Sequence, residues 1–203
     1  MAEDDFEGDL FSLALAAAGF FIFVNLVRSF SAAGASTGGL SFPGIAPGAD
    51  IASMLGIPYT ISDAGRASIK RLEGGFAPNP YKDGPGQSVG WGHQILPTDR
   101  LTFPLSFDQG EALFDGDIAK VEAQLNSTVN VPLNQAQVDA LGDFIFRIGS
   151  GNWQKSATLQ LLNQGDYAGA AQAFNHFIRT NGQVSSALQD RAAAEQSAFS
   201  GVG

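Results

Sequence analysis

Two carboxylic acids, Glu73 and Asp83, have the surroundings that the hydrolysis of a glycosidic bond requires. Glu73 follows the predicted C-terminal end of a helix, where the negative end of the helix dipole and apolar surroundings favour the protonated carboxyl. A carboxyl that keeps its proton near neutral pH can protonate a glycosidic oxygen. Asp83 opens a predicted turn, where solvent and backbone N–H groups favour the ionised form. Two carboxyls in such different environments are the minimum requirement for glycoside hydrolysis.

The residues around this pair supply a hydroxyl group and several glycines. Ser88 falls on the facing strand of a predicted hairpin, where its hydroxyl could help to hold a water molecule. Glycines between Gly84 and Gly92 allow tight turns and the close approach of a bulky polymer. His93 is more typical of a structural hydrogen-bonding residue than of a base. With no cysteine and two histidines in the chain, we expect no metal, no cofactor and no thiolate chemistry.

The negative charge of the chain is concentrated near its N-terminus. The formal net charge of −9 argues against a nucleic-acid partner, which would need a basic surface. Residues 1–60 hold six acidic residues and one basic residue, whereas residues 61–203 hold 14 and 10. The C-terminal part is therefore only mildly acidic. A content of 44% hydrophobic and 15% charged residues excludes both general disorder and a multi-span membrane protein.

An acidic tail over residues 1–9 precedes an apolar segment over residues 10–28. Its first 18 residues, LFSLALAAAGFFIFVNLV, carry no charge and as a helix would span ~27 Å, close to the hydrocarbon thickness of a bilayer. We therefore predict a transmembrane helix that contacts a membrane or virion proteins; a bundled helix and a signal-like segment are the alternatives. The nearest basic residues follow the segment, which by the positive-inside rule would keep the C-terminal domain cytoplasmic. Residues 29–60, rich in Ser, Gly, Ala and Pro, predict a linker.

Residues 61–203 carry the signals of a folded α+β domain. Ser62 can cap a helix that ends before Gly74-Gly75, and the sequence Asp83-Gly84-Pro85-Gly86 is typical of a β-hairpin turn. Capping patterns predict helices that begin after Ser106 and after Asn134. Further helices are expected over 158–163, 166–180 and 185–199, and both tryptophans, Trp91 and Trp153, are expected in the core.

The order and spacing of these residues resemble the phage-type lysozymes, glycoside hydrolase family 24, and within them the endolysins of lambdoid phages. That family shows Glu-Gly, then Tyr-x-Asp, then Gly-x-x-Thr-x-Gly-x-Gly-His. The matching residues are Glu73-Gly74, Tyr81-Lys82-Asp83 and the run from Gly86 to His93. The resemblance continues through 133–153 and 159–179 to 187–199, where Arg191 and Glu195 occupy the matching places. It implies a lysozyme-like fold, with a small β-hairpin lobe and a mainly helical lobe.

The resemblance also implies an activity and roles for the residues. It implies a muramidase that hydrolyses the β-1,4 bond between N-acetylmuramic acid and N-acetylglucosamine in peptidoglycan. The family analogy also implies that the reaction inverts the configuration of the sugar carbon. Glu73 would be the general acid, Asp83 would stabilise positive charge and position the water, and Ser88 would replace the family's threonine. Supporting or substrate-binding residues are expected among Tyr81, His93, Arg147 and Arg191, with ion pairs near Glu73 from the two arginines. An inverting reaction predicts carboxyl groups roughly 6.5–9.5 Å apart.

Two departures from the family spacing concern Asp83. Nine residues separate it from Glu73 where the family has eight, and four separate it from Ser88 where the family has five. The changes cancel, which predicts that Glu73 and Ser88 keep their register while the loop that carries Asp83 is rebuilt. The alternative function is a catalytically degenerate, lysozyme-fold structural protein of a phage particle that binds the cell wall. For an active enzyme, the N-terminal segment fits either a virion-associated muramidase for entry or an endolysin held by a signal anchor at the host inner membrane or periplasm.

Overall fold

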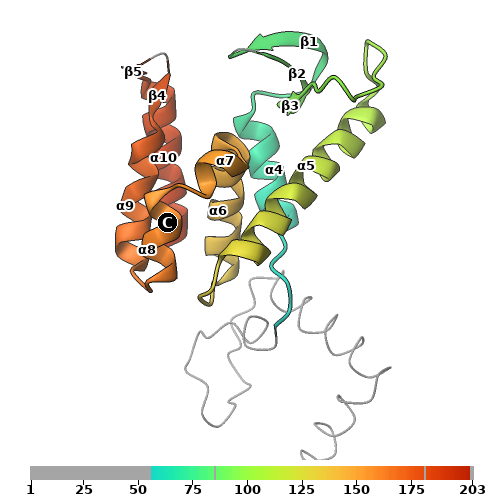
Figure 1. Ribbon diagram of the computed structural model, residues 1–203. Coiled ribbons are helices and arrows are strands. Elements are labelled where there is room, and N and C mark those ends of the chain that lie inside the picture. Colours follow the sequence, from blue (N-terminus) through green and yellow to red (C-terminus); the bar gives the residue numbers. More distant parts are fainter. Residues whose placement is uncertain (1–55, 85, 181, 202–203) are drawn as a thin grey trace, which may run out of the picture. The chain divides into compact units, whose positions relative to one another are not determined.

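The structure, a computed structural model, describes residues 56–84, 86–180 and 182–201 (Figure 1). The chain divides into two units, Met1–Pro58 and Tyr59–Gly203, and every helix and strand named below belongs to the second. The predicted acidic tail, the predicted apolar helix over 10–28 and the predicted linker as far as residue 55 lie outside the described residues. Within the described ranges, no helix is both long enough and apolar enough to cross a membrane.

A short arm at the start of the second unit fixes the position of helix α4 (Asp63–Leu72). The backbone N–H of Tyr59 donates to Asn126 Oδ1 at 2.7 Å, and that of Ile61 donates to Glu122 Oε1 at 2.9 Å. Ser62 caps the helix, as predicted, by accepting a hydrogen bond from the N–H of Gly65. The arm therefore ties the first turn of α4 to the last turns of the next long helix.

The predicted hairpin is present and belongs to a three-stranded antiparallel sheet, in the order β1-β2-β3. Its strands are β1 (Ala77–Asp83), β2 (Gly86–Gly90) and β3 (His93–Gln94). Asp83 pairs with Gly86 across the turn, as the turn sequence predicts. The third strand was not predicted, because two residues are too short to show a strand pattern.

Strand β1 is irregular in the stretch between Glu73 and Asp83. The strand register shifts between Ala77 and Tyr81, in the stretch that contains Pro78 and Pro80. Proline has no N–H to donate to a sheet, so an irregular edge strand is the place where two prolines fit. Beyond the shift, pairing from Tyr81 to Asp83 is regular, and Asp83 keeps a fixed place beside β2.

Two long helices follow, and both begin with the predicted capping boxes. Helix α5 (Phe107–Thr128) starts at Ser106, and helix α6 (Gln135–Ile148) starts at Asn134. At each start, the cap side chain accepts from a glutamine N–H three residues on, and that glutamine's side chain accepts from the cap N–H. Helix α5 contacts β2 and β3 near its N-terminal end and α6 further along.

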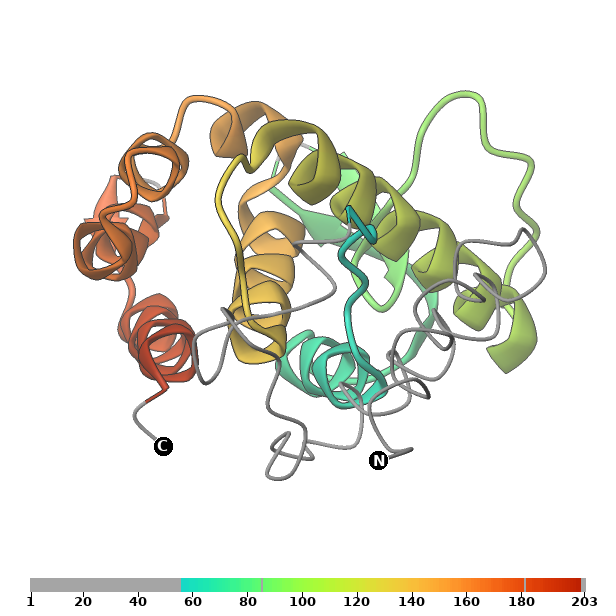
Figure 2. The same cartoon turned by 90° about the horizontal axis from the view of Figure 1, so that it is seen from below.

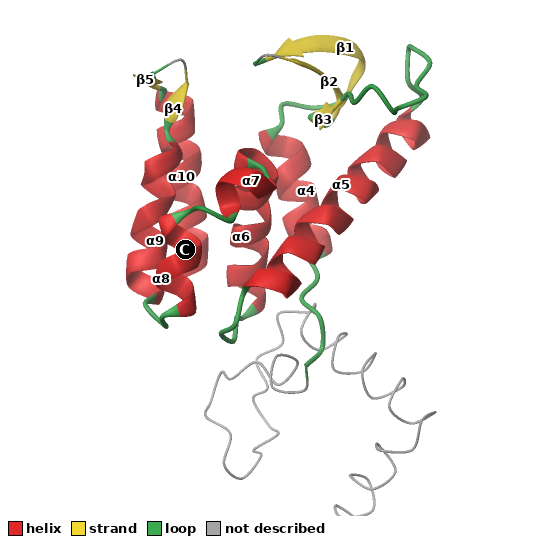
Figure 3. Ribbon diagram, viewed as in Figure 1, coloured by secondary structure: helices red, strands yellow, loops and turns green. Residues whose placement is uncertain are grey.

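The C-terminal part is built from several short helices, a small hairpin and a longer last helix (Figure 3). Its elements are α7 (Ser150–Trp153), α8 (Ala157–Asn163), α9 (Tyr167–Ala173), the 3₁₀ helix η1 (Phe174–Phe177), β4 (Arg179–Thr180), β5 (Gln183–Val184) and α10 (Ser186–Ser200). The helix predicted over 166–180 is wrong beyond Ala173. There the chain tightens into η1 and then turns at Gly182, whose φ of +78° suits glycine.

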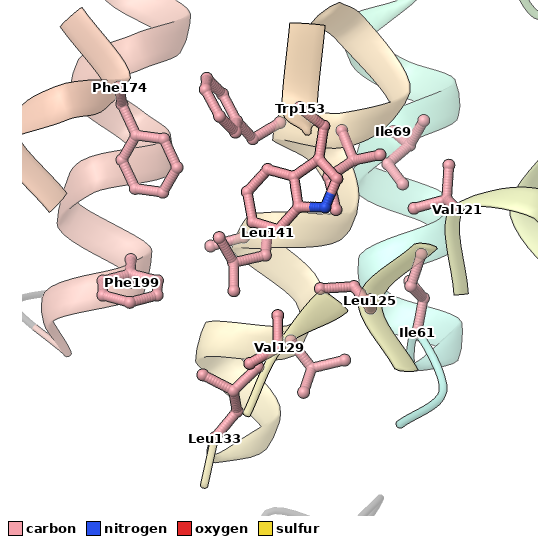
Figure 4. Packing of buried hydrophobic residues seen from close by; sticks show 14 of the residues in the cluster. Ile61, Ile69, Val121, Leu125, Val129, Leu133, Leu141, Trp153, Phe174 and Phe199 are labelled. Atoms are coloured by element: carbon pink, nitrogen blue, oxygen red, sulfur yellow. The ribbon is translucent and has the colours of Figure 1, made fainter. Parts of the chain in front are cut away.

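Helix α6 lies at the centre of the second unit. It contacts α4 and α5 on one side and α10 on the other (Figure 2). The core around it contains Ile69, Leu125 and Leu141 together with Trp153, all fully buried (Figure 4). Trp91 is also buried, so both tryptophans lie in the core as predicted. One face of α6 is thus fixed against the sheet-bearing part and the other against α10.

Candidate active site

Glu73 is held at the C-terminal end of α4 in a mostly buried position. It is the C-cap residue of the helix, and its side chain is 19% exposed. Arg191 Nη1 donates to Glu73 Oε1 at 2.9 Å. Burial is the largest effect and raises the pKa of Glu73. The charge of Arg191 and its hydrogen bond lower this pKa, whereas the negative charges of Asp143 and Asp83 raise it. The net pKa of Glu73 is higher than that of an ordinary glutamate. A carboxyl with this property can act as a general acid.

Gly92 lies directly against the other oxygen of this carboxyl. Its φ is +84°, and a Cβ at this position would stand 2.9 Å from Glu73 Oε2. The sequence predicted that this glycine admits a polymer; the structure shows that it makes room for Glu73. Together with Arg191, Gly92 restricts where the Glu73 carboxyl can lie.

Arg191 is the centre of a buried charge network between α6 and α10. Besides Glu73, it donates to both oxygens of Asp143, with Nη2 on Oδ1 and with Nε 3.3 Å from Oδ2. Its Nε also lies 3.8 Å from Glu195 Oε1. Asp143 is 5% exposed and Glu195 is 3% exposed. The expected ion pair of Arg191 with Glu73 is therefore present, and it is embedded in further pairs.

Arg147 joins the network without contacting Glu73. It binds Glu195 with two hydrogen bonds, Nε to Oε1 at 2.9 Å and Nη2 to Oε2 at 2.5 Å. Its Nη1 donates to the carbonyl of Phe177 at 2.7 Å, at the end of η1. Burial raises the pKa of Glu195 to about 7 in spite of the hydrogen bonds and charge of Arg147. The expected pairing of Arg147 with Glu73 is thus replaced by a pairing with Glu195.

Asp83 and Ser88 are brought together by the hairpin. Ser88 Oγ donates to Asp83 Oδ2 at 2.9 Å, and Ser88 is 1% exposed. Ser88 pairs with Tyr81 in the sheet, and because side chains alternate along a strand, Tyr81 and Asp83 share one face of β1. Burial is the largest cause that raises the pKa of Tyr81, and the negative charges of Asp83 and Glu73 add to the increase. The irregular strand therefore brings Asp83 to the Ser88 hydroxyl.

His93 fastens the sheet to α5. Its Nδ1 lies 2.7 Å from Asp117 Oδ2, its Nε2 lies 3.3 Å from Asp99 Oδ2, and the residue is 7% exposed. The hydrogen bond to Asp117 raises the pKa of His93, burial opposes this, and Asp99 adds to the increase. With a carboxylate at each ring nitrogen, His93 has a structural role and no nitrogen directed to substrate.

Sequence analysis missed Asp143 and the position of Gly92. Asp143 lies within the amphipathic pattern of α6 but is buried with the apolar residues. An acidic residue at the buried face of a helix is unusual unless it is paired, and this was the available signal. Among the residues that the structure describes, no group of three or more metal-binding side chains is arranged to hold a metal ion.

Known proteins are similar to this chain in sequence and in fold. The phage lysozyme family profile matches residues 70–195. The endolysin of Acyrthosiphon pisum secondary endosymbiont phage 1 is 38% identical over 117 residues, which cover 56% of this chain and 77% of that protein. A SAR-endolysin of Escherichia phage Mu is 34% identical over 131 residues, 64% of this chain and 75% of that one.

A solved structure agrees with these matches. The muramidase domain of SpmX from Asticaccaulis excentricus superposes with a TM-score of 0.61 and 32% identity, over 70% of this chain and 97% of that one. The chain belongs to the phage lysozyme family. It is accordingly a hydrolase of the lysozyme class, and peptidoglycan is its class of substrate.

Proposed function

We propose that this protein is a muramidase that cleaves the β-1,4 bond between N-acetylmuramic acid and N-acetylglucosamine in peptidoglycan. The observation that carries the proposal is the Glu73 carboxyl: mostly buried, held by one hydrogen bond from Arg191, and raised in pKa. A second carboxylate, Asp83, is oriented by the Ser88 hydroxyl on the hairpin. This is the acid-and-carboxylate pair that glycoside hydrolysis requires.

In the proposed reaction, Glu73 donates its proton to the glycosidic oxygen as the bond to the muramic acid C1 breaks. Positive charge develops at that carbon, and the Asp83 carboxylate stabilises it and accepts a proton from the attacking water. Ser88 donates to one Asp83 oxygen and so fixes the direction of the carboxylate. We propose inversion at C1, with the water entering opposite the leaving oxygen, and this stays a prediction of the family analogy.

We further propose that the chain acts in host lysis as an endolysin held by a signal anchor. The Mu phage relative is named a SAR-endolysin, and the apolar run over 10–28 with its small-residue linker fits an anchored form. The test is fractionation of expressing cells and of washed phage particles with an antibody to this chain. Recovery from the host membrane and periplasm supports the proposal, whereas recovery in the particles supports the entry role.

The catalytic proposal is tested by Glu73→Gln, which keeps the shape of the side chain and removes its acidic proton. Turbidity clearing and reducing-sugar release from purified peptidoglycan should fall at least about 1,000-fold, as expected for loss of a general acid together with its transition-state charge. Asp63→Asn, at the other end of the same helix, is the matched control and should stay near wild type.

The same experiment separates the enzyme from a wall-binding structural protein. Wild-type protein that sediments with peptidoglycan but releases no reducing sugar would overturn the catalytic proposal. Near-wild-type clearing by Glu73→Gln would leave hydrolysis in place and remove Glu73 from its role.

A further inference from the structure

The ion pair between Arg191 and Glu73 poses a chemical problem for a general acid. A guanidinium at hydrogen-bond distance favours the ionised carboxylate and can lower the pKa of an acid by 1–3 units. Arg191 Nη1 lies 2.9 Å from Glu73 Oε1. If Glu73 were the only partner of Arg191, the arginine would favour the ionised carboxylate, and Glu73 would lose the proton that the reaction uses.

The geometry of Arg191 shows how this conflict is resolved. Two of its three nitrogens are directed to Asp143, one to each carboxylate oxygen, and one nitrogen is left for Glu73. Asp143 is buried on α6 and faces Arg191 on α10. The positive charge of Arg191 is thus matched at close range by a carboxylate other than Glu73.

The charge count of the network points the same way. It contains three carboxyls, Glu73, Asp143 and Glu195, and two guanidiniums, Arg147 and Arg191. With every group ionised, the network would carry one uncompensated negative charge in a poorly solvated place, which favours the binding of one proton.

We propose, on the basis of the muramidase function proposed above, that Asp143 is a positioning residue that neutralises the charge of Arg191. Arg191 can then hold the Glu73 carboxyl in place without favouring the loss of its proton. Asp143 itself does not touch the substrate. It acts through Arg191, and its effect is on the protonation state of the general acid.

The other groups around Glu73 are consistent with this assignment. Asp83 and Tyr81 approach from β1, Glu195 lies 3.8 Å from Arg191 on α10, and Arg147 is occupied by Glu195. Glu73 accepts one hydrogen bond from an arginine, whereas Asp143 and Glu195 each share two close contacts with one. Burial also raises the pKa of Glu195, to about 7, so Glu195 competes with Glu73 for the proton of the network. The negative charge of Asp143 also contributes to the raised pKa of Glu73, after burial as the largest cause.

The test is the pH dependence of kcat/KM for peptidoglycan with the full-length Asp143→Asn variant. Asparagine keeps the size of the side chain and removes its charge, so Glu73 is the only carboxylate left at hydrogen-bond distance from Arg191. The basic limb of the profile, which reports loss of the Glu73 proton, should move down by about one pH unit. Activity should fall about tenfold above that limb and change less than about twofold below it.

Two further variants separate this effect from a structural one. Asp143→Glu keeps the charge and should keep the basic limb near its wild-type position. Asp139→Asn, one turn away on α6, removes a carboxylate that binds Ser62 and Gln135 rather than Arg191, and should leave the profile unshifted. A uniform loss at all pH values in Asp143→Asn, or an equal shift in Asp139→Asn, would overturn the proposal.

A titration that needs neither enzymatic activity nor the Asp143→Asn variant completes the test. The ¹³C carboxyl resonance of Glu73 in wild-type protein, assigned through Glu73→Gln, should titrate above the ordinary glutamate value of about 4.3. Titration below that value would refute the proposal even if Asp143→Asn failed to fold. If Glu73 titrates as expected but wild-type protein releases no sugar, the muramidase function fails, and the role of Asp143 is then decided by whether the Glu73 titration moves to lower pH in Asp143→Asn.

Discussion

Replacing Asp117 with asparagine should destabilise the protein in a strongly pH-dependent way. Asp117 lies on α5 and accepts the closest hydrogen bond of His93, 2.7 Å from Nδ1. The His93 side chain is 8% exposed, and that of Asp117 is 19% exposed. Because His93 begins β3, this contact joins the sheet that carries Asp83 and Ser88 to the long helix α5.

The sign of the pH dependence follows from the two pKa directions. The hydrogen bond to Asp117 raises the pKa of His93 above its ordinary 6.5, so the stability it contributes is fully present below pH 6.5 and is lost as the pH rises through the folded-state pKa. Burial would raise the pKa of Asp117, but the hydrogen bonds from His93 and Lys120 hold it below its ordinary 3.8. Its contribution is present above that value and is lost as the pH falls through the folded-state pKa. The window of full stabilisation therefore lies between about pH 4 and pH 6.5.

The size of the effect follows from the number and burial of the contacts. A hydrogen bond between charged groups is worth about 1.5–3 kcal/mol. The pair of Asp117 with Lys120, whose side chain is 65% exposed, adds little. Asp117→Asn should therefore lower the free energy of unfolding by about 1.5–3 kcal/mol near pH 5.5, and by less than about 1 kcal/mol once the pH has passed the folded-state pKa of His93.

Urea unfolding of the full-length protein, followed by tryptophan fluorescence at pH 5.5 and pH 9.5, measures this difference. Asp115→Asn is the matched control on the same helix, because Asp115 pairs with Arg66 at a side chain that is 58% exposed; its effect should be small at both pH values. A loss for Asp117→Asn that is equal at both pH values would refute the role of the charged histidine.

Substitutions of Gly92, Ser88 and Glu195 have definite expected outcomes, and the first two have a control variant. Gly92→Ala should lower activity about 10- to 100-fold by displacing the carboxyl of Glu73, the proposed general acid. The control is Gly149→Ala, at a φ of +79° and with no atom within 4 Å of a new Cβ. It should lose similar stability in thermal melts and keep its activity. Ser88→Ala removes the hydrogen bond to Asp83 and should lower kcat by about tenfold, with Ser88→Thr retaining most of it in reducing-sugar assays. Glu195, whose pKa is raised to about 7, makes wild type lose stability as the pH rises from about 4.5 through 7; Glu195→Gln should flatten that slope in melts at pH 5 and pH 8.

The helix starts were predictable from sequence because each depends on a local contact. The caps at Ser62, Ser106 and Asn134 bind backbone groups three residues away, and all three are present. The hairpin turn at Asp83 is equally local. The end of η1 is different, because the carbonyl of Phe177 accepts a hydrogen bond from Arg147, 30 residues earlier in the chain, and no periodicity reports such a contact.

The same distinction between local and long-range contacts applies to the candidate site. Spacing and family resemblance brought Glu73, Asp83 and Ser88 into one prediction, and the hairpin does join Asp83 to Ser88. The partners of Arg147 and the place of Asp143 in the charge network depend on how α6 faces α10. Arg147 and Glu195, which join these two helices, are 48 residues apart in the sequence. Long-range facing of two helices is a tertiary property, so the buried charge network was out of reach of residue spacing.

The central claim is tested most directly by the chemistry of the new chain ends in digested peptidoglycan. Purified glycan strands digested with the full-length protein are reduced with borohydride, hydrolysed in acid and analysed for amino sugar alcohols, with Glu73→Gln as the blank. A muramidase leaves N-acetylmuramic acid at the reducing end, so the account predicts muramitol in wild-type digests and none above background with the variant. Glucosaminitol in place of muramitol, or equal release by the variant, would contradict it.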